Sequence, residues 1–486
     1  MTGRGMPPPR ARFGPPPARR PAPRPARPPA RRGRTRGLRL GRLNGRLRFG
    51  FAAMCTLLLV IGGRLVQLQG VDGSKYAGAA AAQRTDQVVI HAMRGPILDR
   101  DGVTLAYTST AQDITADPSQ ITAAAAKQPK GRPNLIVTYA TALAPLVGKS
   151  EYAVAKLING TGRYALIATA ISPVAAQRIT ALNLIGIYTQ PSTSREYPGR
   201  TTAANIIGTV HSDGTGAAGV EAQYNSVLAG KDGSLTYSVD NAGNVNPSSR
   251  TVSVPARNGG AIKLTIDQSL QFTAQQYLDQ AVRESGARSA EMVVLDAHTA
   301  QVLAMASSGT YDASNPNTIS NTTPMNPPVM SAFEPGSVQK AITFAAAIQQ
   351  GVIKPSTVIS VPPQITMGDT TVSDAWYHPT ERFTATGILA ESSNVGTLKI
   401  AQRLGPKAWD RYERRFGVGQ TTGIELPGES AGYLPPMSTW SGSSFANLPF
   451  GQGESMTVLR LASVYQTFAN AGVQVEPRIV QSITAP

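Results

Sequence analysis

The stretch that decides the fold is EPGSVQKAITFAAAIQQG, residues 334–351. Pro335-Gly336 breaks the chain, the Ala- and Ile-rich run that follows predicts a helix buried on nearly all sides, and Gly351 is suited to end it. Ser337 is therefore expected at the helix N-terminus, where free backbone N–H groups and the positive end of the helix dipole favour developing negative charge. Lys340 follows three residues later, on the same face of the helix.

This Ser-x-x-Lys pair is able to carry out acyl transfer. A lysine that burial keeps neutral can take the proton of the serine hydroxyl and so make the serine a nucleophile. The alternative is a capping serine beside an ordinary lysine, and the string alone is too short and common to choose between them. The setting favours chemistry, because a lysine on an otherwise apolar helix is not a solvated surface charge.

A second motif, Ser392-Ser393-Asn394, begins 55 residues after Ser337. Its neighbours are apolar or small, so its polar groups need partners. Ser392 could relay a proton toward a leaving group, and Asn394 could bind a substrate amide or hold Lys340. The same three residues are also suited to cap a helix, which is the more common use of such a string. A third block, residues 291–311, predicts two strands joined by a turn and is interpreted as core sheet.

The formal net charge of the chain is +17, and nearly all of it lies at one end. Residues 1–48 hold 15 arginines and no acidic residue, which leaves +2 for everything that follows. A basic nucleic-acid-binding face on the folded part is therefore not expected, and no nucleic-acid partner is predicted; for the tail itself, PxxP ligation and nucleic-acid binding are the alternatives to a solvated basic segment. The Pro-, Arg- and Gly-rich residues 1–48 have few large apolar side chains, so they predict a disordered basic tail.

Residues 49–70 predict a single transmembrane helix. Residues 49–63 are uncharged and largely apolar, and with the run after Arg64 they reach roughly 20 residues, about one bilayer crossing. Arginines at positions 42–48 flank the start, so the N-terminus is expected in the cytoplasm and everything after about residue 70 outside it. A cleaved signal peptide is the alternative, but the small residues at 77–83 lie too far beyond the apolar run for normal cleavage.

The rest of the composition excludes several kinds of site. One cysteine, Cys55, rules out an intrachain disulfide and a cysteine-based metal site, and the four histidines show no metal-ligand spacing. No Walker or GxGxxG motif is present, so neither a metal nor a cofactor is expected.

Residues 71–255 contain no arrangement of nucleophile and base and are interpreted as a mixed α/β scaffold. Within them, RGPILDRDG (94–102) predicts a turn at Asp101-Gly102 between two strands. Arg94, Asp99 and Arg100 are expected to form charge pairs around that hairpin, in a structural and not a chemical role.

Ser-x-x-Lys followed by Ser-x-Asn matches two of the three motifs of the penicillin-recognising serine acyl transferases. The wider text is more specific: besides RGPILDRDG it includes EYPGRTTAANIIG (196–208), GVEAQYNSVLAGKDGS (219–234), LPGESAG (426–432) and PFGQGESMTVLRLASVYQTFANAG (449–472). From residue 49 onward the chain resembles the class B penicillin-binding proteins, most closely the division-specific (septal) peptidoglycan D,D-transpeptidases of actinobacteria.

The resemblance implies an α+β protein in which a single membrane anchor is followed by a pedestal (dimerisation-type) domain over 71–255 and a transpeptidase domain over 256–486, with helices packed on an antiparallel sheet. It also implies that Ser337 is the acylated nucleophile, Lys340 its general base, Ser392 a catalytic proton relay and Asn394 a substrate-binding residue. The substrate would be a peptidoglycan stem peptide ending in D-Ala-D-Ala. β-Lactams would be inhibitors, and a glycosyltransferase and other division proteins would be partners.

The chain departs from the family pattern at two places. Thr299-Ala300-Gln301 stands where the family usually has Thr-Gly-Glu, and no KTG or KSG motif occurs before the chain ends at Pro486. We therefore expect a fragment of a longer gene product, cut before the third motif, in preference to a natural truncation. Two other functions stay open: a non-catalytic, membrane-anchored division scaffold, and a β-lactam-hydrolysing or β-lactam-sensing relative.

Overall fold

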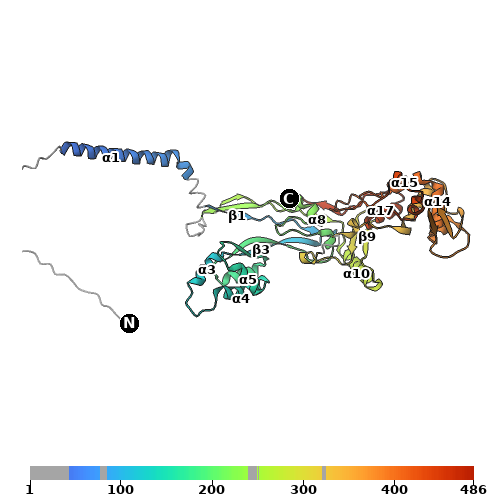
Figure 1. The fold of residues 1–486 in the computed structure, drawn as a ribbon, viewed down its shortest axis with the longest axis horizontal. Helices are drawn as coiled ribbons and strands as arrows, with labels where there is room; N and C mark the ends of the chain where they lie inside the picture. The colour runs from blue at the N-terminus through green and yellow to red at the C-terminus, as the bar shows by residue number, and fades with distance from the viewer. Residues whose placement is uncertain (1–42, 77–84, 239–248, 250, 320–324, 486) are drawn as a thin grey trace, which may run out of the picture. The chain divides into compact units, whose positions relative to one another are not determined.

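A computed structural model describes residues 43–76, 85–238, 249, 251–319 and 325–485 (Figure 1). The chain forms two compact units, Met1–Gln83 and Arg84–Pro486. The predicted disordered tail over 1–48 lies outside the described residues except for 43–48, which are helical.

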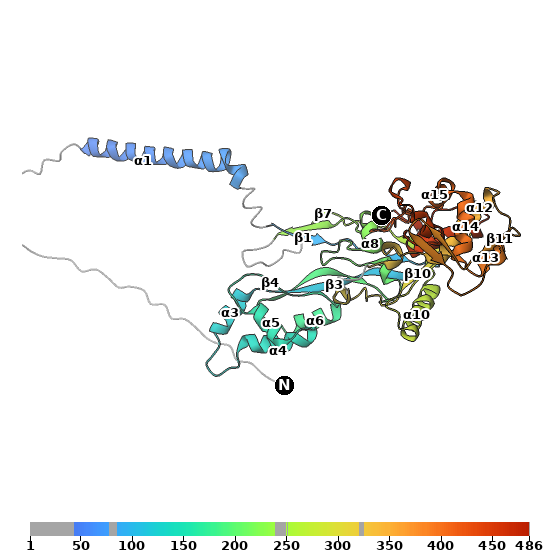
Figure 2. The same cartoon turned by 45° about the vertical axis from the view of Figure 1, so that its right-hand side comes forward.

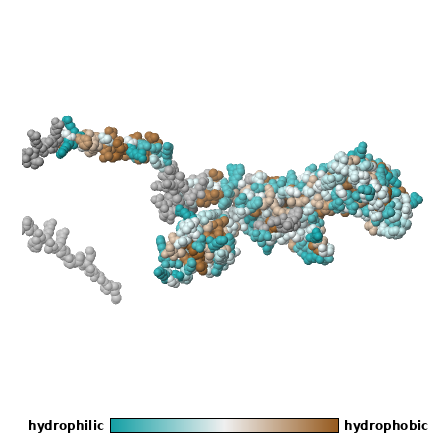
Figure 3. Space-filling model, viewed as in Figure 1, coloured by the Kyte–Doolittle hydropathy of each residue, from teal (hydrophilic) through white to brown (hydrophobic). Residues whose placement is uncertain are grey.

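The first unit contains one long apolar helix, α1 (Leu43–Val66), which continues as a π-helical turn, η1 (Gln67–Val71). The apolar span covers Gly45–Val71, 27 residues, and none of it is buried in the protein. Its brown side chains are seen along the helix in Figure 3. At 1.5 Å per residue this helix is long enough to cross a membrane, and it begins six residues before the predicted span.

The second unit is built around a six-stranded sheet in the order β15-β8-β2-β3-β4, with β5 paired to β3. The strands are β2 (Ile97–Leu98), β3 (Thr104–Ala116), β4 (Ala165–Ile171), β5 (Ile187–Glu196), β8 (Ile262–Leu264) and β15 (Val480–Ile483). The predicted turn at Asp101-Gly102 is confirmed: Gly102 has a φ of 92°, and the Asp99 carboxylate accepts the backbone N–H of Asp101 and Val103. It joins β2 to β3 as an antiparallel pair.

We call residues 85–255 the pedestal region and residues 256–485 the C-terminal region. The two share the six-stranded sheet, because β8 from the C-terminal region runs parallel to β2 from the pedestal region and also pairs with β15. The domain boundary at residues 255 and 256 therefore stays a prediction.

Four helices of the pedestal region lie against β3 and β4 (Figure 2). They are α3 (Pro118–Ala126), α4 (Leu135–Val147), α5 (Glu151–Ile158) and α6 (Pro173–Ala181). Each begins at a side chain that accepts a backbone N–H of the first turn: Asp117, Asn134, Ser150 and Ser172. Ile121, Leu143 and Ile158 fill the space between these helices and Ile114 of β3.

A three-stranded ribbon in the order β1-β6-β7 completes the pedestal region, with β1 (Thr85–Ile90), β6 (Gly233–Ser238) and β7 (Thr251–Val254). Three short helices accompany it: α7 (Ala204–Ile207), α8 (Gly219–Gln223) and α9 (Asn225–Leu228). The backbone approaches itself closely where the ribbon meets β2. A Cβ on Gly95 would lie 1.8 Å from the Gly260 carbonyl oxygen, so only glycine fits there.

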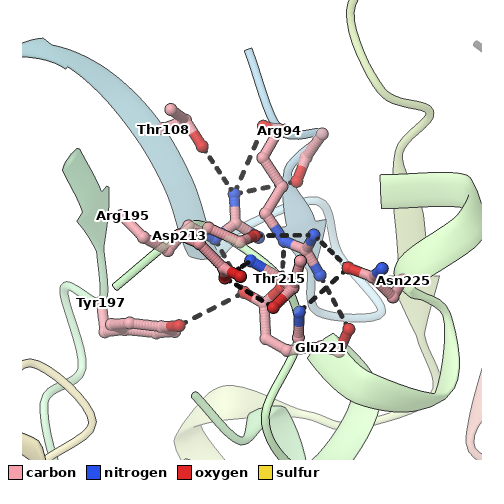
Figure 4. A network of polar contacts seen from close by, with 11 residues as sticks. Arg94, Thr108, Arg195, Tyr197, Asp213, Thr215, Glu221 and Asn225 are labelled. Carbon is pink, nitrogen blue, oxygen red and sulfur yellow. Dashed lines mark hydrogen bonds and ion pairs between the residues drawn. The ribbon is translucent and has the colours of Figure 1, made fainter. Parts of the chain in front are cut away.

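A buried ion-pair network ties these pedestal elements together (Figure 4). Arg94 Nε donates to Glu221 Oε2 at 2.6 Å, and Arg195 Nε donates to Glu221 Oε1 at 2.7 Å. Their side chains are 7%, 5% and 0% exposed for Arg94, Arg195 and Glu221. The expectation that Arg94 pairs with Asp99 at the hairpin is therefore wrong, because the carboxylate that meets Arg94 comes from α8, 127 residues away.

The C-terminal region begins with α10 (Gln268–Ser285), which packs against the hairpin of β9 (Glu291–Leu295) and β10 (Val302–Ser307) (Figure 2). This confirms the two strands predicted over 291–311. At their turn Ala300 has a φ of 52°, the left-handed conformation that favours glycine. Two further two-stranded antiparallel sheets follow, β11 (Val358–Val361) with β14 (Glu381–Thr384) and, between them in the chain, the hairpin of β12 (Gln364–Met367) and β13 (Thr370–Ser373).

The remaining elements of the C-terminal region are mainly helical. They are η3 (Pro316–Thr318), α11 (Pro327–Met330), η4 (Gly336–Gln339), α12 (Lys340–Gln349), α13 (Ala385–Ala390), α14 (Asn394–Leu404), α15 (Pro406–Arg415), η5 (Met437–Thr439), α16 (Ser444–Asn447), η6 (Leu448–Phe450) and α17 (Val458–Ala469). Helices and mostly antiparallel strands in one chain confirm the α+β class.

Helix α12 lies in the core of the C-terminal region. Phe344 and Ala347 pack in one apolar cluster with side chains of α14, and Ile342 and Ala346 pack in a second cluster with Trp409 of α15. The helix ends before Gly351, whose φ is 70°. The predicted helix, buried on nearly all sides and stopped by a glycine, is confirmed.

Candidate active site

Ser337 lies on the short 3₁₀ turn η4 that leads into α12. In a 3₁₀ turn residues three apart lie above one another, so Ser337 and Lys340 belong to the same side. Ser337 is exposed, whereas Gln339 and Lys340 are buried. Within the described residues, no hydrogen bond joins Ser337 Oγ to Lys340 Nζ. The serine is open to a substrate while the lysine points into the protein.

The segment from Pro449 to Met456 holds the turn that carries Ser337. Gly336 N donates to the Gly451 carbonyl at 2.9 Å, and Gly453 N donates to Glu334 Oε1 at 2.9 Å. A Cβ on Gly451, whose φ is 81°, would lie 2.2 Å from the Gly336 carbonyl oxygen. The PFGQGES text thus supports the serine physically, a role that the sequence alone did not reveal.

Lys340 is fully buried and donates only to neutral acceptors. Its Nζ reaches Asn394 Oδ1 at 2.8 Å and Ser392 Oγ at 3.1 Å, and it also donates to the Ser392 carbonyl. Burial lowers the pKa of Lys340 to about 8, against the opposing charge of Asp374. A lysine in this position is partly neutral near neutral pH, as a general base must be.

The residues of Ser392-Ser393-Asn394 divide between a helix cap and contacts with Lys340, while the roles of Ser392 as a relay and Asn394 in substrate binding stay predictions. Ser393 caps α14, since its Oγ accepts Gly396 N at 2.8 Å. Ser392 and Asn394 contact the lysine. Ser392 has a φ of 57°, which is uncommon for a residue with a side chain, and presents both its carbonyl and its hydroxyl to Lys340. Hydrogen bonds thus bring Lys340, Ser392 and Asn394 together, and Ser337 lies three residues before Lys340 with no hydrogen bond to any of them among the described residues.

Four buried ionisable residues near this point were not predicted from the sequence: Asp374, His378, Glu413 and Glu454. Glu413 accepts a hydrogen bond from Gln339 Nε2, directly beside Lys340 in the chain. Burial and the neighbouring Glu454 raise the pKa of Glu413 well above its usual value, and burial together with Glu334 raises the pKa of Glu454 to about 8. No local motif marks these residues, because they come from three separate segments: Asp374 and His378 from the loop after β13, Glu413 from α15, and Glu454 from the segment before α17.

The described residues hold no group of three or more His, Cys, Asp or Glu side chains arranged to hold a metal ion. The polar groups that surround Ser337 and Lys340 suit acyl transfer by a serine with a lysine base.

Comparison with known proteins agrees with this chemistry. A family model for the penicillin-binding protein transpeptidase domain matches residues 290–485, and one for the penicillin-binding protein dimerisation domain matches residues 89–264. Penicillin-binding protein PbpB of Mycolicibacterium smegmatis is 40% identical over 461 residues, which cover 91% of this chain and 70% of that protein. PbpB of Mycobacterium tuberculosis is 40% identical over 450 residues, 91% of this chain and 66% of that protein.

A solved structure is also similar: penicillin-binding protein 3 of Mycobacterium tuberculosis in complex with ampicillin has a TM-score of 0.61 and 36% identity. The match covers 82% of this chain and 68% of that one. The chain thus spans about two thirds of the length of these relatives.

Proposed function

The chain belongs to the class B penicillin-binding proteins, a family of penicillin-binding peptidoglycan D,D-transpeptidases, and on this premise we propose that it crosslinks stem peptides at the division septum. The observation that carries the proposal is Lys340, fully buried, donating only to neutral acceptors, and one turn from an exposed serine. The septal role is supported by the 40% identity to the mycobacterial PbpB proteins and the 32% identity to the peptidoglycan D,D-transpeptidase FtsI of Escherichia coli.

In the first half-reaction, neutral Lys340 takes the proton of Ser337, and Ser337 Oγ attacks the carbonyl carbon of the penultimate D-alanine. The oxyanion forms beside the backbone N–H of Ser337, at the start of the helix. Ser392 Oγ, 3.1 Å from Lys340 Nζ, relays the proton to the nitrogen of the terminal D-alanine, which leaves as the amine. The product is an ester between Ser337 and the shortened stem peptide.

In the second half-reaction, an amine from a neighbouring stem peptide attacks the ester carbonyl. Lys340 accepts the proton of that amine, and Ser337 recovers its own proton as the ester bond breaks. Asn394 binds the substrate backbone while its Oδ1 keeps Lys340 in place. A β-lactam follows the first half-reaction and stops at the ester, which accords with the ampicillin complex of the related penicillin-binding protein 3.

We also propose a place for the reaction. α1 anchors the protein in the cell membrane as a single span, with Arg46 and Arg48 on the cytoplasmic side and residues 85–485 outside the cytoplasm. There the enzyme meets lipid-linked glycan chains, so its partners are a glycosyltransferase and other division proteins. Protease added to intact protoplasts should digest the part after residue 85 and spare the N-terminal tail.

The catalytic proposal is tested with fluorescent penicillin and the full-length gene product. The wild type should retain the label through denaturing electrophoresis, Ser337→Ala should retain none, and the exposed-serine control Ser269→Ala should label like the wild type. Turnover of a chromogenic β-lactam should be slow. Rapid turnover would indicate a β-lactamase, and a folded wild type that takes no label would indicate the non-catalytic scaffold.

A further inference from the structure

Behind the Ser392-Ser393-Asn394 motif lies a buried Asp374–His378 pair that the mechanism above does not use. Asp374 follows β13, and its side chain is 0% exposed, while that of His378 is 3% exposed. His378 Nε2 lies 3.0 Å from Asp374 Oδ2. Neither residue contacts Lys340 directly, so the question is what they do one layer away from it.

Asp374 organises the start of α14. Its Oδ2 accepts the hydroxyl proton of Ser393 at 2.7 Å, and its Oδ1 accepts the backbone N–H of Val395 at 3.0 Å. Ser393 and Val395 flank Asn394, whose Nδ2 donates to the Ser373 carbonyl at 3.2 Å. The Asp374 carboxylate therefore fixes both chain neighbours of Asn394, the residue whose Oδ1 accepts from Lys340. Ser392, which precedes Ser393 in the chain, has the left-handed conformation.

The hydrogen bonds of His378 define its charge. Nδ1 lies 2.7 Å from the Pro379 carbonyl oxygen and Nε2 lies 3.0 Å from the Asp374 carboxylate. The Pro379 carbonyl accepts, and so does Asp374 when it is ionised, so this geometry favours a ring in which both nitrogens donate, the imidazolium. Burial alone lowers the pKa of His378, but its hydrogen bonds to Pro379 and Asp374 and the charges of Asp374 and Glu381 outweigh burial and raise it.

The rings of Trp376 and Phe383 flank His378, with centroids 5.4 and 6.1 Å away, and help to keep water out. Asp374 and His378 together therefore carry no net charge. The net charge of the pair matters for Lys340, because the negative charge of Asp374 favours the protonated form of the lysine. A carboxylate paired with an imidazolium favours that form less than an unpaired carboxylate does.

We propose that the Asp374–His378 pair is a positioning device for the second motif and that its net charge sets the proton affinity of Lys340. Asp374 holds Ser392 and Asn394 around the lysine through Ser393 and Val395, and His378 cancels the carboxylate charge so that the lysine can be neutral. The inference rests on the proposed function. Among the described residues, the charged group that acts on Lys340 is Asp374, and those that act on His378 are Asp374 and Glu381.

Substitutions of Asp374 and of His378 should therefore shift the pH dependence of the acylation rate in opposite directions. Only neutral Lys340 accepts the serine proton, so the acylation rate rises with pH up to the pKa of the lysine. Asp374→Asn removes the carboxylate whose charge acts on Lys340 and should move the midpoint of this rise about one pH unit lower. His378→Gln leaves the carboxylate uncompensated and should move the midpoint about one unit higher, which is roughly a tenfold slower rate below the midpoint.

The experiment measures the rate constant for acylation by fluorescent penicillin from pH 5.5 to 9.5 in the full-length gene product. Ser393→Ala breaks the contact with Asp374 without changing any charge, so it should lower the rate at every pH and leave the midpoint in place. His298→Gln, at an exposed histidine of the β9–β10 turn, is the matched control and should change neither. The ¹³Cε NMR signal of Lys340 reports the same midpoints without any substrate.

Midpoints that move together, or do not move, in Asp374→Asn and His378→Gln would overturn the inference while labelling of the wild type upholds the proposed function. If the wild type takes no label, the proposed function fails, and the NMR titration still decides the inference. If His378→Gln does not fold, the double variant Asp374→Asn/His378→Gln takes its place: it carries neither charge, so its midpoint must return toward that of the wild type and lie above that of Asp374→Asn.

Discussion

In the pedestal region Arg94 and Arg195 both donate to the carboxylate of Glu221, whereas in the C-terminal region Lys340 donates to an amide oxygen, a hydroxyl and a carbonyl. All four side chains are at least nine-tenths buried. A buried cation beside a carboxylate stays charged and ties its neighbours together. A buried cation given only neutral acceptors binds its proton less tightly and becomes a base.

Replacing the buried cation of the C-terminal region should have the largest effect on activity. Lys340→Met fills the same space without a charge, so we expect acylation by penicillin to fall by about 10²–10⁴-fold while the free energy of unfolding stays the same or rises. Acylation kinetics and denaturant unfolding measure the two effects. Lys407→Met, at an exposed lysine, is the control. A large loss of stability in Lys340→Met would show that Lys340 stabilises the fold, as Arg94 and Arg195 do.

Removing the shared carboxylate of the pedestal region should have the opposite signature. Glu221→Gln leaves two buried guanidinium groups without an anion, so the free energy of unfolding should fall by about 3–5 kcal/mol. Molecules that remain folded should acylate at the wild-type rate, because Glu221 lies outside the Ser337 site. Denaturant unfolding with Glu284→Gln as an exposed control measures the loss. A folded Glu221→Gln of unchanged stability would show that the network is dispensable.

Glu454 is a buried acidic residue with neither a cation nor a donor beside it: among the described residues no hydrogen bond reaches either of its carboxylate oxygens. Its pKa in the folded protein is about 8, raised from 4.5 by burial and by Glu334. Between pH 4.5 and about 8, Glu454 is therefore protonated in the folded protein and ionised in the unfolded chain. The stability that comes from keeping this carboxyl group neutral is complete below pH 4.5 and is lost as the pH rises through about 8.

Glu454→Gln removes that ionisation. At pH 8.5 the variant should be more stable than the wild type by about 1–3 kcal/mol, with a smaller gain at pH 5.5. Thermal unfolding at both pH values measures the difference, again beside Glu284→Gln. A variant less stable than the wild type at pH 8.5 would mean that the carboxylate has a cationic partner in the folded protein.

The smallest effect is expected at the rim of the pedestal network. Tyr197 donates its hydroxyl to Glu221 Oε1 at 3.4 Å, a long contact beside the two short ones from the arginines. Tyr197→Phe should cost about 0.5–1.5 kcal/mol of unfolding free energy and should leave acylation unchanged. A loss as large as that of Glu221→Gln would show that the tyrosine, and not the ion pairs, holds the network.

Local patterns predicted the elements near the site well. The apolar run after Pro335-Gly336 became α12, Gly351 ended it, and Ser393 capped α14, since each depends on residues within a few positions of one another. The partner of Arg94 was predicted wrongly, because a local pattern points only to nearby residues such as Asp99. The true partner is Glu221 of α8, 127 residues away.

Local sequence patterns were enough to predict a long apolar helix near the N-terminus and the position of Ser337 and Lys340 on one side of one turn, and resemblance was enough to predict the family. The tertiary structure was needed to show that Lys340 meets neutral acceptors and that Asp374 and His378 lie behind the second motif. It was also needed to show that Glu454 is buried with no hydrogen-bond partner among the described residues. The physical reason is that helix formation and hydropathy depend on neighbours along the chain. Proton affinity depends instead on burial and on nearby charges that come from distant segments, as Glu334 acts on Glu454 from 120 residues away in the sequence.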